Sequence, residues 1–508
     1  MPVELGRRQI IYVTLLLVVF ASFLSFYRVD EALHEDSVLW YGAVKHFWAA
    51  IARGDFANTR PYPHPGVTLM WISGLFMKLD GTLAADISPV GVFAVKLPGA
   101  LIGVLSAALT FPLAIACLGQ SQWRPALVLA LLLVTDAALV EQARIGQLDM
   151  AALGLAWLGA WTAILAYERG SWRWALGAGP LFAASALCKL SYGAVPATLL
   201  PILAATTVLD RFRDKRGLMV AFLVSVSAAL AFWLMWPALW VSPVRTLHRV
   251  IHETVALANH GHPHVVDGQR VRDPGLSYYP SAIASVAPPE TLILAAFGLV
   301  ALGFLPRLRK HYCWLLLSFI PYLLMVVLAS KKHARYASPA LSMLCLLAGA
   351  SIEWLTPRLQ AWSKRMPFAP MALLALLFVG RYVRDVRLLP EAEPCTPWPG
   401  VECGRPQDKN FMREMALGIA SDWQARGRTQ KPHVFVGQPQ LMSPWLRAKK
   451  ARSPQVADYV VVWDKEFDDP ESGSMGQRSR ERFGRLGKEL LVVRRSGRVV
   501  ARVFRKAR

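Results

Sequence analysis

The sequence predicts an all-α protein that crosses a membrane many times and ends in a small soluble α/β domain. Its 508 residues are 54% hydrophobic and only 18% charged, with a mean hydropathy of +0.35. This is more apolar than a soluble chain of this length needs to fill its core. Apolar runs long enough to cross a bilayer recur as far as Gly380 and then stop. We therefore expect a transmembrane domain over residues 1–380 and a soluble domain over residues 381–508.

The first apolar run, Ile10–Tyr27, has 18 residues and no charge. It is longer than the apolar region of a typical signal peptide and no clear cleavage site follows it, so we expect an uncleaved helix. The other apolar runs are Val95–Leu118, Pro125–Val140, Met150–Tyr167, Trp174–Leu187, Tyr192–Leu209, Leu218–Trp240, Thr291–Leu305, Tyr312–Ala329, Tyr336–Leu355 and Phe368–Gly380. Together they predict about eleven transmembrane helices.

The loops between these runs alternate in charge. If the N-terminus is cytoplasmic, every second loop is cytoplasmic and carries Lys or Arg, as in DRFRDKRG and PRLRKHY. The first outer loop (28–89), the long outer loop (241–290) and the C-terminal domain then lie on the opposite side. We expect an integral multi-pass protein of a bacterial inner membrane whose active site faces the periplasm. The net charge of +22 fits loops held at an anionic leaflet. Because the basic residues are scattered between spans, we expect no nucleic-acid partner.

The C-terminal region alternates helical and strand-like patterns. An amphipathic pattern predicts a helix at Asn410–Gln424, and two apolar runs predict strands at His433–Gly437 and Asp458–Trp463. A final pair of strands would turn at Ser496 and Gly497. These elements predict a small α/β domain, in which we find no metal-binding signature.

Ionisable side chains in two of the outer loops point to chemistry. Four carboxylates, Asp30, Glu31, Glu35 and Asp36, follow the first span closely, where charge is costly unless it has a partner or a function. The loop SKKHARY places Lys and Arg on the side where positive charge is usually sparse, and a phosphate held at the membrane surface would explain them. The alternatives are a solvated turn and a local exception to the charge rule. Transfer of a sugar from a lipid phosphate needs both groups, a carboxylate to accept a proton and cations to neutralise the phosphate.

The order of these features resembles the GT-C glycosyltransferases of the protein O-mannosyltransferase and lipid A aminoarabinose transferase type, also called family 39. The segments that carry the resemblance are the acidic loop, GDF (Gly54–Phe56), PHPGVTLMW (Pro63–Trp71), EQARIGQLDMAALGLAW (Glu141–Trp157), ALCKLSYGAVPATLLPIL (Ala186–Leu203) and KKHARYASPALSMLCLLAG (Lys331–Gly349). It covers about residues 10–355 and leaves out the C-terminal domain. It implies the GT-C fold.

By position, the resemblance implies a catalytic base in the first outer loop. Asp36 lies 18 residues before Gly54 and fits the spacing to the GDF segment best. Asp30 and Glu31 keep the family's Asp-Glu pair but lie farther away. Glu35 precedes Asp36, so the usual order of the acidic pair is reversed here.

The resemblance also implies residues that bind the sugar phosphate. They are His64, Arg144, Asp149, Lys189, Lys331, Lys332, His333, Arg335 and Tyr336. Lys332 and Arg335 are the strongest candidates for phosphate ligands, whereas Lys189 departs from the family order because three residues separate it from Gly193. His64 has the alternative of stabilising the turn before Pro65. Asp149 could instead cap a helix that begins at Met150, or form a salt bridge with Arg144.

The long outer loop contains four histidines. They are His252, His260, His262 and His264. Their spacing makes zinc conceivable, but GHPH has no helical i,i+4 pair, so we assign no metal ligands and no cofactor and leave a divalent metal open. We expect this segment to cover the active site or to meet the acceptor.

These observations together predict an inverting glycosyltransferase. It would take a sugar from a polyprenyl-phosphate donor in the bilayer and give it to an acceptor lipid, glycan or protein on the non-cytoplasmic face. The alternative is a transporter or flippase of a lipid-linked or anionic solute, but such proteins often have two related halves and we find no internal repeat. A third hypothesis is a scaffold that binds through its C-terminal domain, which deletion of the residues after Gly380 would distinguish.

Overall fold

The computed structural model describes most of the transmembrane domain and part of the C-terminal domain. The described residues are 5–27, 29, 35–60, 62, 64–83, 89–261, 264–266 and 269–363, together with five strands of the C-terminal region. The predicted span Phe368–Gly380 and the predicted helix Asn410–Gln424 lie outside the described residues. Apart from its strands, the described chain is almost entirely helical.

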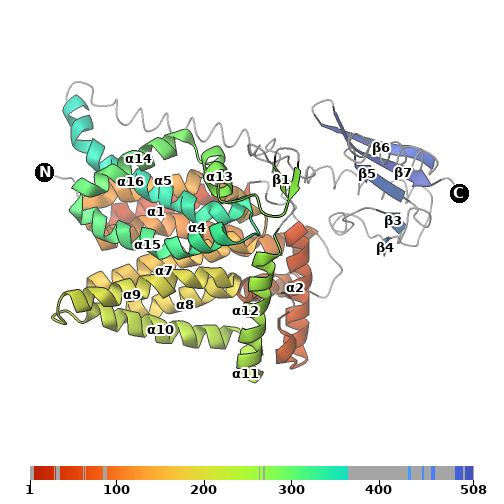
Figure 1. Ribbon diagram of the computed structural model, residues 1–508, viewed down its shortest axis with the longest axis horizontal. Coiled ribbons are helices and arrows are strands. Elements are labelled where there is room, and N and C mark those ends of the chain that lie inside the picture. The colour runs from red at the N-terminus through yellow and green to blue at the C-terminus, as the bar shows by residue number, and fades with distance from the viewer. Residues whose placement is uncertain are drawn as a thin grey trace.

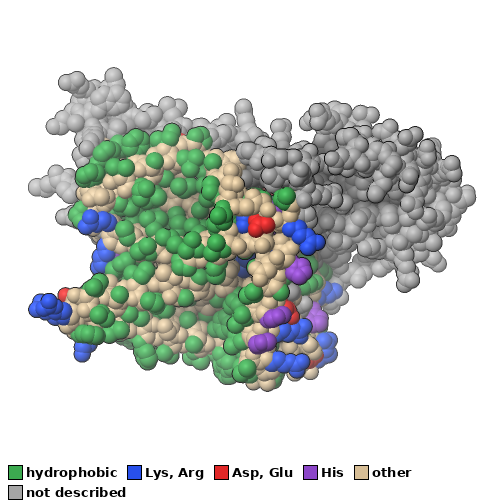
Figure 2. Space-filling model, viewed as in Figure 1, with side chains coloured by type: hydrophobic (Ala, Val, Ile, Leu, Met, Phe, Trp, Pro, Cys, Tyr) green, Lys and Arg blue, Asp and Glu red, His purple; other side chains and the backbone are tan. Residues whose placement is uncertain are grey.

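Long apolar helices run side by side along the long axis of the view in Figure 1. They are α1 (Arg7–Phe26), α4 (Pro89–Leu118), α7 (Leu148–Arg169), α9 (Ala194–Leu209), α10 (Arg216–Met235), α15 (Pro306–Leu328) and α16 (Ser338–Ser363). Within the described residues, seven helices are long and apolar enough to cross a membrane, or nine if each of two bent pairs is one span. The chain is therefore an integral multi-pass membrane protein. Hydrophobic side chains cover the flank of this bundle in Figure 2, while Lys and Arg gather near its two ends and His near one of them.

The number of spans found in the described residues is lower than the predicted number of about eleven. The run Trp174–Leu187 forms α8 (Trp172–Cys188), which has 17 residues and is short for a span, although it packs along α7. The last predicted span lies outside the described residues.

The structure contains two bent pairs of helices, and one of them breaks a predicted span. The run Pro125–Val140 forms α5 (Trp123–Thr135) and α6 (Ala137–Arg144), which meet at 53°. Asp136 causes the break because its Oδ1 accepts hydrogen bonds from the N–H groups of Ala138 and Leu139, both at 3.1 Å, and so caps α6. The second bent pair is α13 (Tyr278–Val286) and α14 (Pro289–Phe304), at 113°.

Helix α7 lies at the centre of the bundle. Every residue from Leu148 to Ala166 is buried. Its many Ala and Gly residues allow close approach of its neighbours: a Cβ on Gly154 would lie 2.8 Å from Ile102 Cγ2 of α4, and one on Gly159 would lie 2.9 Å from Phe182 of α8. The first turn of α7 is therefore held firmly between neighbouring helices.

Shorter helices lie at the end of the bundle where α7 begins, which we call the site end. They are α2 (Glu35–Ala52), α3 (Val67–Leu79), α11 (Ala238–Val241) and α12 (Pro243–Asn259), with the short turns η1 (Phe56–Asn58), η3 (Leu190–Gly193) and η4 (Ala334–Ala337). Helices α2 and α12 run across the bundle axis in Figure 1. The turn η2 (Gln120–Gln122) connects α4 to α5. Strands β1 (His264–Val266) and β2 (Gln269–Val271) form an antiparallel hairpin in the long outer loop.

The C-terminal strands form one mixed sheet. They are β3 (His433–Phe435), β4 (Lys449–Lys450), β5 (Tyr459–Trp463), β6 (Gly487–Arg495) and β7 (Arg498–Lys506), in the order β4-β3-β5-β7-β6. Strands form within the predicted runs His433–Gly437 and Asp458–Trp463, and the predicted final pair is present as β6 and β7, which pair in antiparallel orientation. The predicted turn residues Ser496 and Gly497 lie outside the described residues. Strand β3 is parallel to β4 and β5, an arrangement that needs crossover connections.

Candidate functional site

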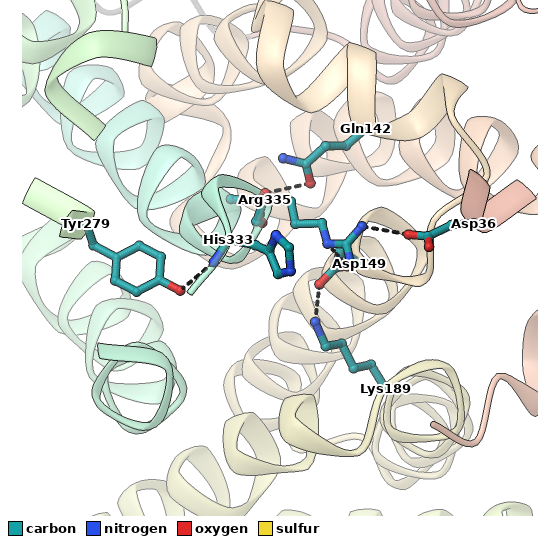
Figure 3. A network of polar contacts seen from close by, with 8 residues as sticks. Asp36, Gln142, Asp149, Lys189, Tyr279, His333 and Arg335 are labelled. Carbon is teal, nitrogen blue, oxygen red and sulfur yellow. Dashed lines mark hydrogen bonds and ion pairs between the residues drawn. The ribbon is translucent and has the colours of Figure 1, made fainter. Parts of the chain in front are cut away.

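Four segments that are far apart in the sequence meet at the site end of the bundle. They are the first turns of α2 and α7, the η3 turn after α8, and the η4 turn between α15 and α16. Each segment supplies an ionisable side chain, and Figure 3 shows these side chains pointing toward one another. We call Asp36, Asp149, Lys189 and Arg335 the charge cluster.

Arg335 is the centre of the charge cluster. Its Nη1 donates a hydrogen bond to Asp36 Oδ2 at 2.6 Å, across 299 residues of sequence, and its Nε lies 3.6 Å from Asp149 Oδ2. The Arg335 and Asp36 side chains keep 22% and 26% of their surface exposed, so this pair borders the outside of the bundle. The planar guanidinium has five donors in a fixed fork, which lets one side chain serve two carboxylates.

Asp149 lies in the first turn of α7, where the helix dipole favours a negative charge. Its Oδ1 accepts a hydrogen bond from Lys189 Nζ at 2.5 Å. The predicted role of Asp149 as a helix cap is wrong, because α7 begins at Leu148 and its N-cap residue is Gln147. The alternative salt bridge with Arg144 is also wrong, because Asp149 pairs with Lys189 and Arg335.

Lys189 belongs to the charge cluster, although its position in the sequence departs from the family order. Its ammonium is 3.7 Å from the centroid of the Tyr336 ring as well as 2.5 Å from Asp149. The three residues between Lys189 and Gly193 form the η3 turn, in which Tyr192 N–H donates to Lys189 O at 3.0 Å. The η3 turn therefore accommodates the extra residues, and Lys189 stays within the charge cluster.

His64 lies close to this cluster and is neutral at pH 7. Burial, and after it the positive charge of Lys189, lower the pKa of His64 to about 4; Lys331 and Arg335 act in the same direction, and Asp149 opposes them. Its Nδ1 is buried and has no hydrogen-bond partner among the described residues. The imidazole can therefore offer a hydrogen bond, while a phosphate at this position would favour its charged form.

A tight turn after His64 holds this segment against α8. Gly66 has φ +59° and donates its N–H to Cys188 O at 3.3 Å, next to Lys189. A Cβ at Gly66 would overlap the Trp40 ring, so only glycine fits there. Thr68 adds a hydrogen bond from its hydroxyl to Ala184 O at 2.8 Å.

Two buried cations fix the chain between α1 and α2. Arg144 Nη2 donates to Tyr27 O at 2.5 Å, and Lys96 Nζ donates to Val29 O at 2.7 Å. Arg144 was predicted to bind the phosphate, and this contact ties it to Tyr27, the C-cap residue of α1. Lys96 was not predicted, because a lone Lys in an apolar run carries no motif. Asp30 and Glu31 lie outside the described residues, and so does the side chain of Glu35.

Lys332 has partners other than the charge cluster. Its ammonium donates to Val327 O at 2.9 Å and Ala329 O at 2.6 Å and lies 3.2 Å from Asp273 Oδ1. The prediction that Lys332 and Arg335 act together on one phosphate therefore differs from the contacts found. Within the described chain, the Lys331 side chain has no ion pair, and its charge acts on His64.

Three further contacts complete the surroundings of Arg335, and the sequence did not predict them. The His333 N–H donates to the Tyr279 hydroxyl at 3.4 Å, and the His333 ring lies 5.3 Å from the Tyr336 ring. Ser338 donates to Gln142 Oε1 at 2.7 Å (Figure 3). Gln142 belongs to α6 and Tyr279 to α13, so both bent pairs of helices contribute to the site.

The described residues contain no group of three His, Cys, Asp or Glu side chains placed to hold a metal ion. The His252 ring stacks on His248, and His264 packs against Tyr278 with ring centroids 5.2 Å apart. His260 Nδ1 lies 3.2 Å from Ala256 O, and His262 lies outside the described residues.

The fold has counterparts among known proteins. The chain has the GT-C glycosyltransferase fold. A family model described as dolichyl-phosphate-mannose-protein mannosyltransferase matches residues 64–236. Among solved structures, ArnT from Cupriavidus metallidurans in the apo state is similar with a TM-score of 0.56 and 17% identity, over 96% of this chain and 97% of ArnT.

Two further structures have ligands named with them. ArnT bound to undecaprenyl phosphate is similar with a TM-score of 0.52, 17% identity and the same coverage. The archaeal oligosaccharyltransferase AglB from Archaeoglobus fulgidus, in complex with an inhibitory peptide and a dolichol-phosphate, is similar with a TM-score of 0.51 and 10% identity, over 97% of this chain and 74% of AglB. A comparison with curated protein sequences finds no match.

Proposed function

We propose that the protein is an inverting glycosyltransferase that moves a sugar from a polyprenyl-phosphate donor to an acceptor on the non-cytoplasmic face of the membrane. The observation that carries this proposal is the contact between Asp36 and Arg335. It brings a candidate base and a candidate phosphate ligand together at one end of the helical bundle.

The proposed reaction needs one proton acceptor and several cations. The Asp36 carboxylate accepts the proton from the acceptor's hydroxyl or amine. The freed oxygen or nitrogen bonds to the anomeric carbon as the bond from that carbon to the phosphate oxygen breaks. Attack from the side opposite the phosphate inverts the configuration, and the lipid leaves as a phosphate monoester with one more negative charge.

Three cations can take up this new charge. Arg335 and Lys189 belong to the charge cluster, and Lys331 is near His64. Arg335 can keep Asp149 with one edge of its fork while another donor turns to the phosphate, which also frees Asp36 to act as a base. Preorganised cations of this kind stabilise the charge that develops in the transition state.

The comparisons support the class of donor. One ArnT structure contains undecaprenyl phosphate and one AglB structure contains a dolichol-phosphate, which are both polyprenyl phosphates. The charged loops favour a non-cytoplasmic site. Because the predicted base and cations lie within one cluster, a transferase explains the site better than a transporter, whose polar residues would line a path through the bundle.

Transfer assays on the purified protein test this proposal. The donors are radiolabelled polyprenyl-phosphate sugars, including mannose and aminoarabinose, and the acceptors are membrane lipid and protein extracts. Asp36→Asn should lower transfer by about 10²–10⁴-fold, because a positioned base contributes about this much. Binding of undecaprenyl phosphate should persist in this variant, which shows that it is folded.

Glu168→Gln is the matched control, because it neutralises an acid of α7 at the opposite end of the bundle. It should transfer at close to the parental rate. Transfer by Asp36→Asn at the parental rate would contradict the assignment of the base. Label that crosses a vesicle membrane while still joined to its lipid would instead support the flippase hypothesis.

A further inference from the structure

The long outer loop holds three successive residues of the loop that carries Arg335. Lys331 N–H donates to Ala258 O at 2.9 Å, Lys332 Nζ lies 3.2 Å from Asp273 Oδ1, and His333 N–H donates to the Tyr279 hydroxyl at 3.4 Å. Arg335 follows two residues later. The position of its guanidinium therefore depends on contacts made outside the charge cluster.

Lys332 makes the tightest of these connections. Its side chain is 1% exposed, and it donates to the carbonyl oxygens of Val327 and Ala329, at the C-terminal end of α15. An ammonium group has three N–H donors, and here three oxygen atoms surround it, the third belonging to Asp273. Lysine at the end of a helix stabilises the last carbonyl groups in this way. No donor of Lys332 is left for a phosphate.

We propose that Lys332 is a positioning residue, which ties residues 269–277 of the long outer loop to the loop that carries Arg335. We call residues 269–277 the outer strap. The inference rests on the proposed function, because it takes Arg335 as the phosphate ligand whose direction Lys332 controls. Closure of the outer strap and orientation of the Arg335 guanidinium toward Asp36 and Asp149 then occur in the same conformational change.

The ion pair is stable at neutral pH. Burial opposes the charge on Asp273, but the hydrogen bond from the Gly275 N–H and the nearby Lys332 ammonium outweigh it and lower the pKa of Asp273 below 3.8. A carboxylate with a lowered pKa stabilises the folded contact above its unfolded pKa and loses this effect only as the pH falls through the folded value. The outer strap should therefore stay closed throughout the neutral and mildly acidic range.

Of the two residues in this ion pair, Asp273 is the one that can move away when the outer strap opens. Its side chain is 43% exposed, whereas Lys332 is buried. An acceptor that enters from the outside would meet the outer strap first, and moving Asp273 would leave the Lys332 charge buried without its partner, which is strongly unfavourable. The outer strap should therefore close again, and the ion pair re-form, once the acceptor has bound or left.

Trypsin accessibility tests the connection without any need for transfer activity. Arg272 is exposed and precedes Asp273, so the peptide that ends at Arg272 reports on the outer strap. In full-length protein in detergent, we expect Asp273→Asn and Lys332→Met each to raise the initial cleavage rate after Arg272 at least fivefold. The conservative variant Asp273→Glu should restore most of the protection. Unchanged cleavage in both disruptive variants would overturn the inference.

Binding of undecaprenyl phosphate separates positioning from direct contact. Lys331→Met is the matched control, because Lys331 is tied to Ala258 by its backbone and its side chain is a proposed phosphate ligand. Lys331→Met should weaken lipid phosphate binding and leave cleavage unchanged. Lys332→Met and Asp273→Asn break the same connection to the loop that carries Arg335, so the two variants should change the affinity and the transfer rate by similar factors. If Lys332→Met instead loses affinity while Asp273→Asn does not, Lys332 is a phosphate ligand and the inference is wrong.

These measurements separate the two proposals. If the wild-type protein transfers no sugar, the proposed function fails, while the cleavage rates still decide whether Lys332 and Asp273 hold the outer strap. If transfer depends on Asp36 but the cleavage rates do not change, only the inference about Lys332 fails.

Discussion

Helix α7 carries an acid at each end, and each acid has two basic partners. At the site end, Asp149 in the first turn meets Lys189 and Arg335. At the opposite end, Glu168 in the last turn accepts hydrogen bonds from Lys310 Nζ and His311 Nε2, both at 2.9 Å. The same kinds of charge thus occur at both ends of one helix, in different surroundings.

The opposite end behaves as a structural junction. The helix dipole disfavours an acid at the end of a helix, so Glu168 needs its two partners. The Lys310 side chain is 43% exposed, and its ammonium lies 4.7 Å from the centroids of both the Tyr167 and Trp314 rings. Partly exposed pairs of this kind join elements at little cost and with little gain.

The charge cluster differs in burial and in its second carboxylate. The side chain of Asp149 is only 5% exposed, and its partner Arg335 also contacts Asp36. Taking several charges out of water is costly, and their mutual attraction often does no more than offset that cost. The fold therefore needs only a simple junction such as that of Glu168 at the opposite end. The extra buried charges of the site end are best explained by a ligand.

The largest difference between the two ends of α7 is expected in the transfer rate when Arg335 is changed. Arg335→Lys keeps one positive charge but loses the fork that serves Asp36 and Asp149 together, so transfer should fall by about 10²–10³-fold. The rate is measured with the labelled donor, and the matched change Lys310→Gln at the opposite end should leave it within about twofold. Equal losses in the two variants would show that the ends do not differ in function.

The next effect is on stability and is expected at Asp149. Asp149→Ala leaves Lys189 buried without its acid and should lower the free energy of unfolding by about 3–5 kcal/mol. Glu168→Ala should cost only about 1 kcal/mol, because its side chain is 27% exposed and water can replace the lost contacts. Thermal unfolding in detergent, followed by tryptophan fluorescence, compares the two. Similar shifts in the midpoint would contradict the difference in burial.

The smallest effect depends on pH and is expected at His64. Its pKa is about 4 in the folded protein against 6.5 for the free side chain, so unfolding takes up a proton between these values. The folded state should therefore lose up to about 3 kcal/mol as the pH falls from 6.5 to 4. His64→Gln should remove this part of the pH dependence. The midpoints of unfolding at pH 7 and pH 4.5 test it, and an unchanged pH dependence in the variant would rule out a buried neutral His64.

Much of the fold could be predicted from the length of the apolar runs. The exceptions are places where one polar residue changes the backbone, as Asp136 does by capping α6 inside an apolar run. Hydropathy averages over such a residue and therefore predicts one straight span. The antiparallel pair of β6 and β7 was predictable because its alternating strands are neighbours in the sequence.

The candidate site was less predictable, because a motif names residues but not their directions. Lys332 and Arg335 lie in the same short loop, yet Lys332 turns back onto the end of α15 while Arg335 reaches the charge cluster. Lys189 departs from the family order in the sequence, but the η3 turn that follows it keeps it next to Asp149. Asp273 and Tyr279 carried no signal, because their roles come from contacts with a distant loop.

The sequence alone is enough to predict that this chain spans a membrane, because a helix in lipid needs a long apolar run and this chain has many such runs. It also showed which loops carry the ionisable residues. The contacts of Asp36 with Arg335 and of Lys332 with Asp273 follow from the folded arrangement and could not be predicted from the sequence. The reason is physical: contacts across hundreds of residues depend on how helices pack around α7, and no local pattern of residues specifies that packing.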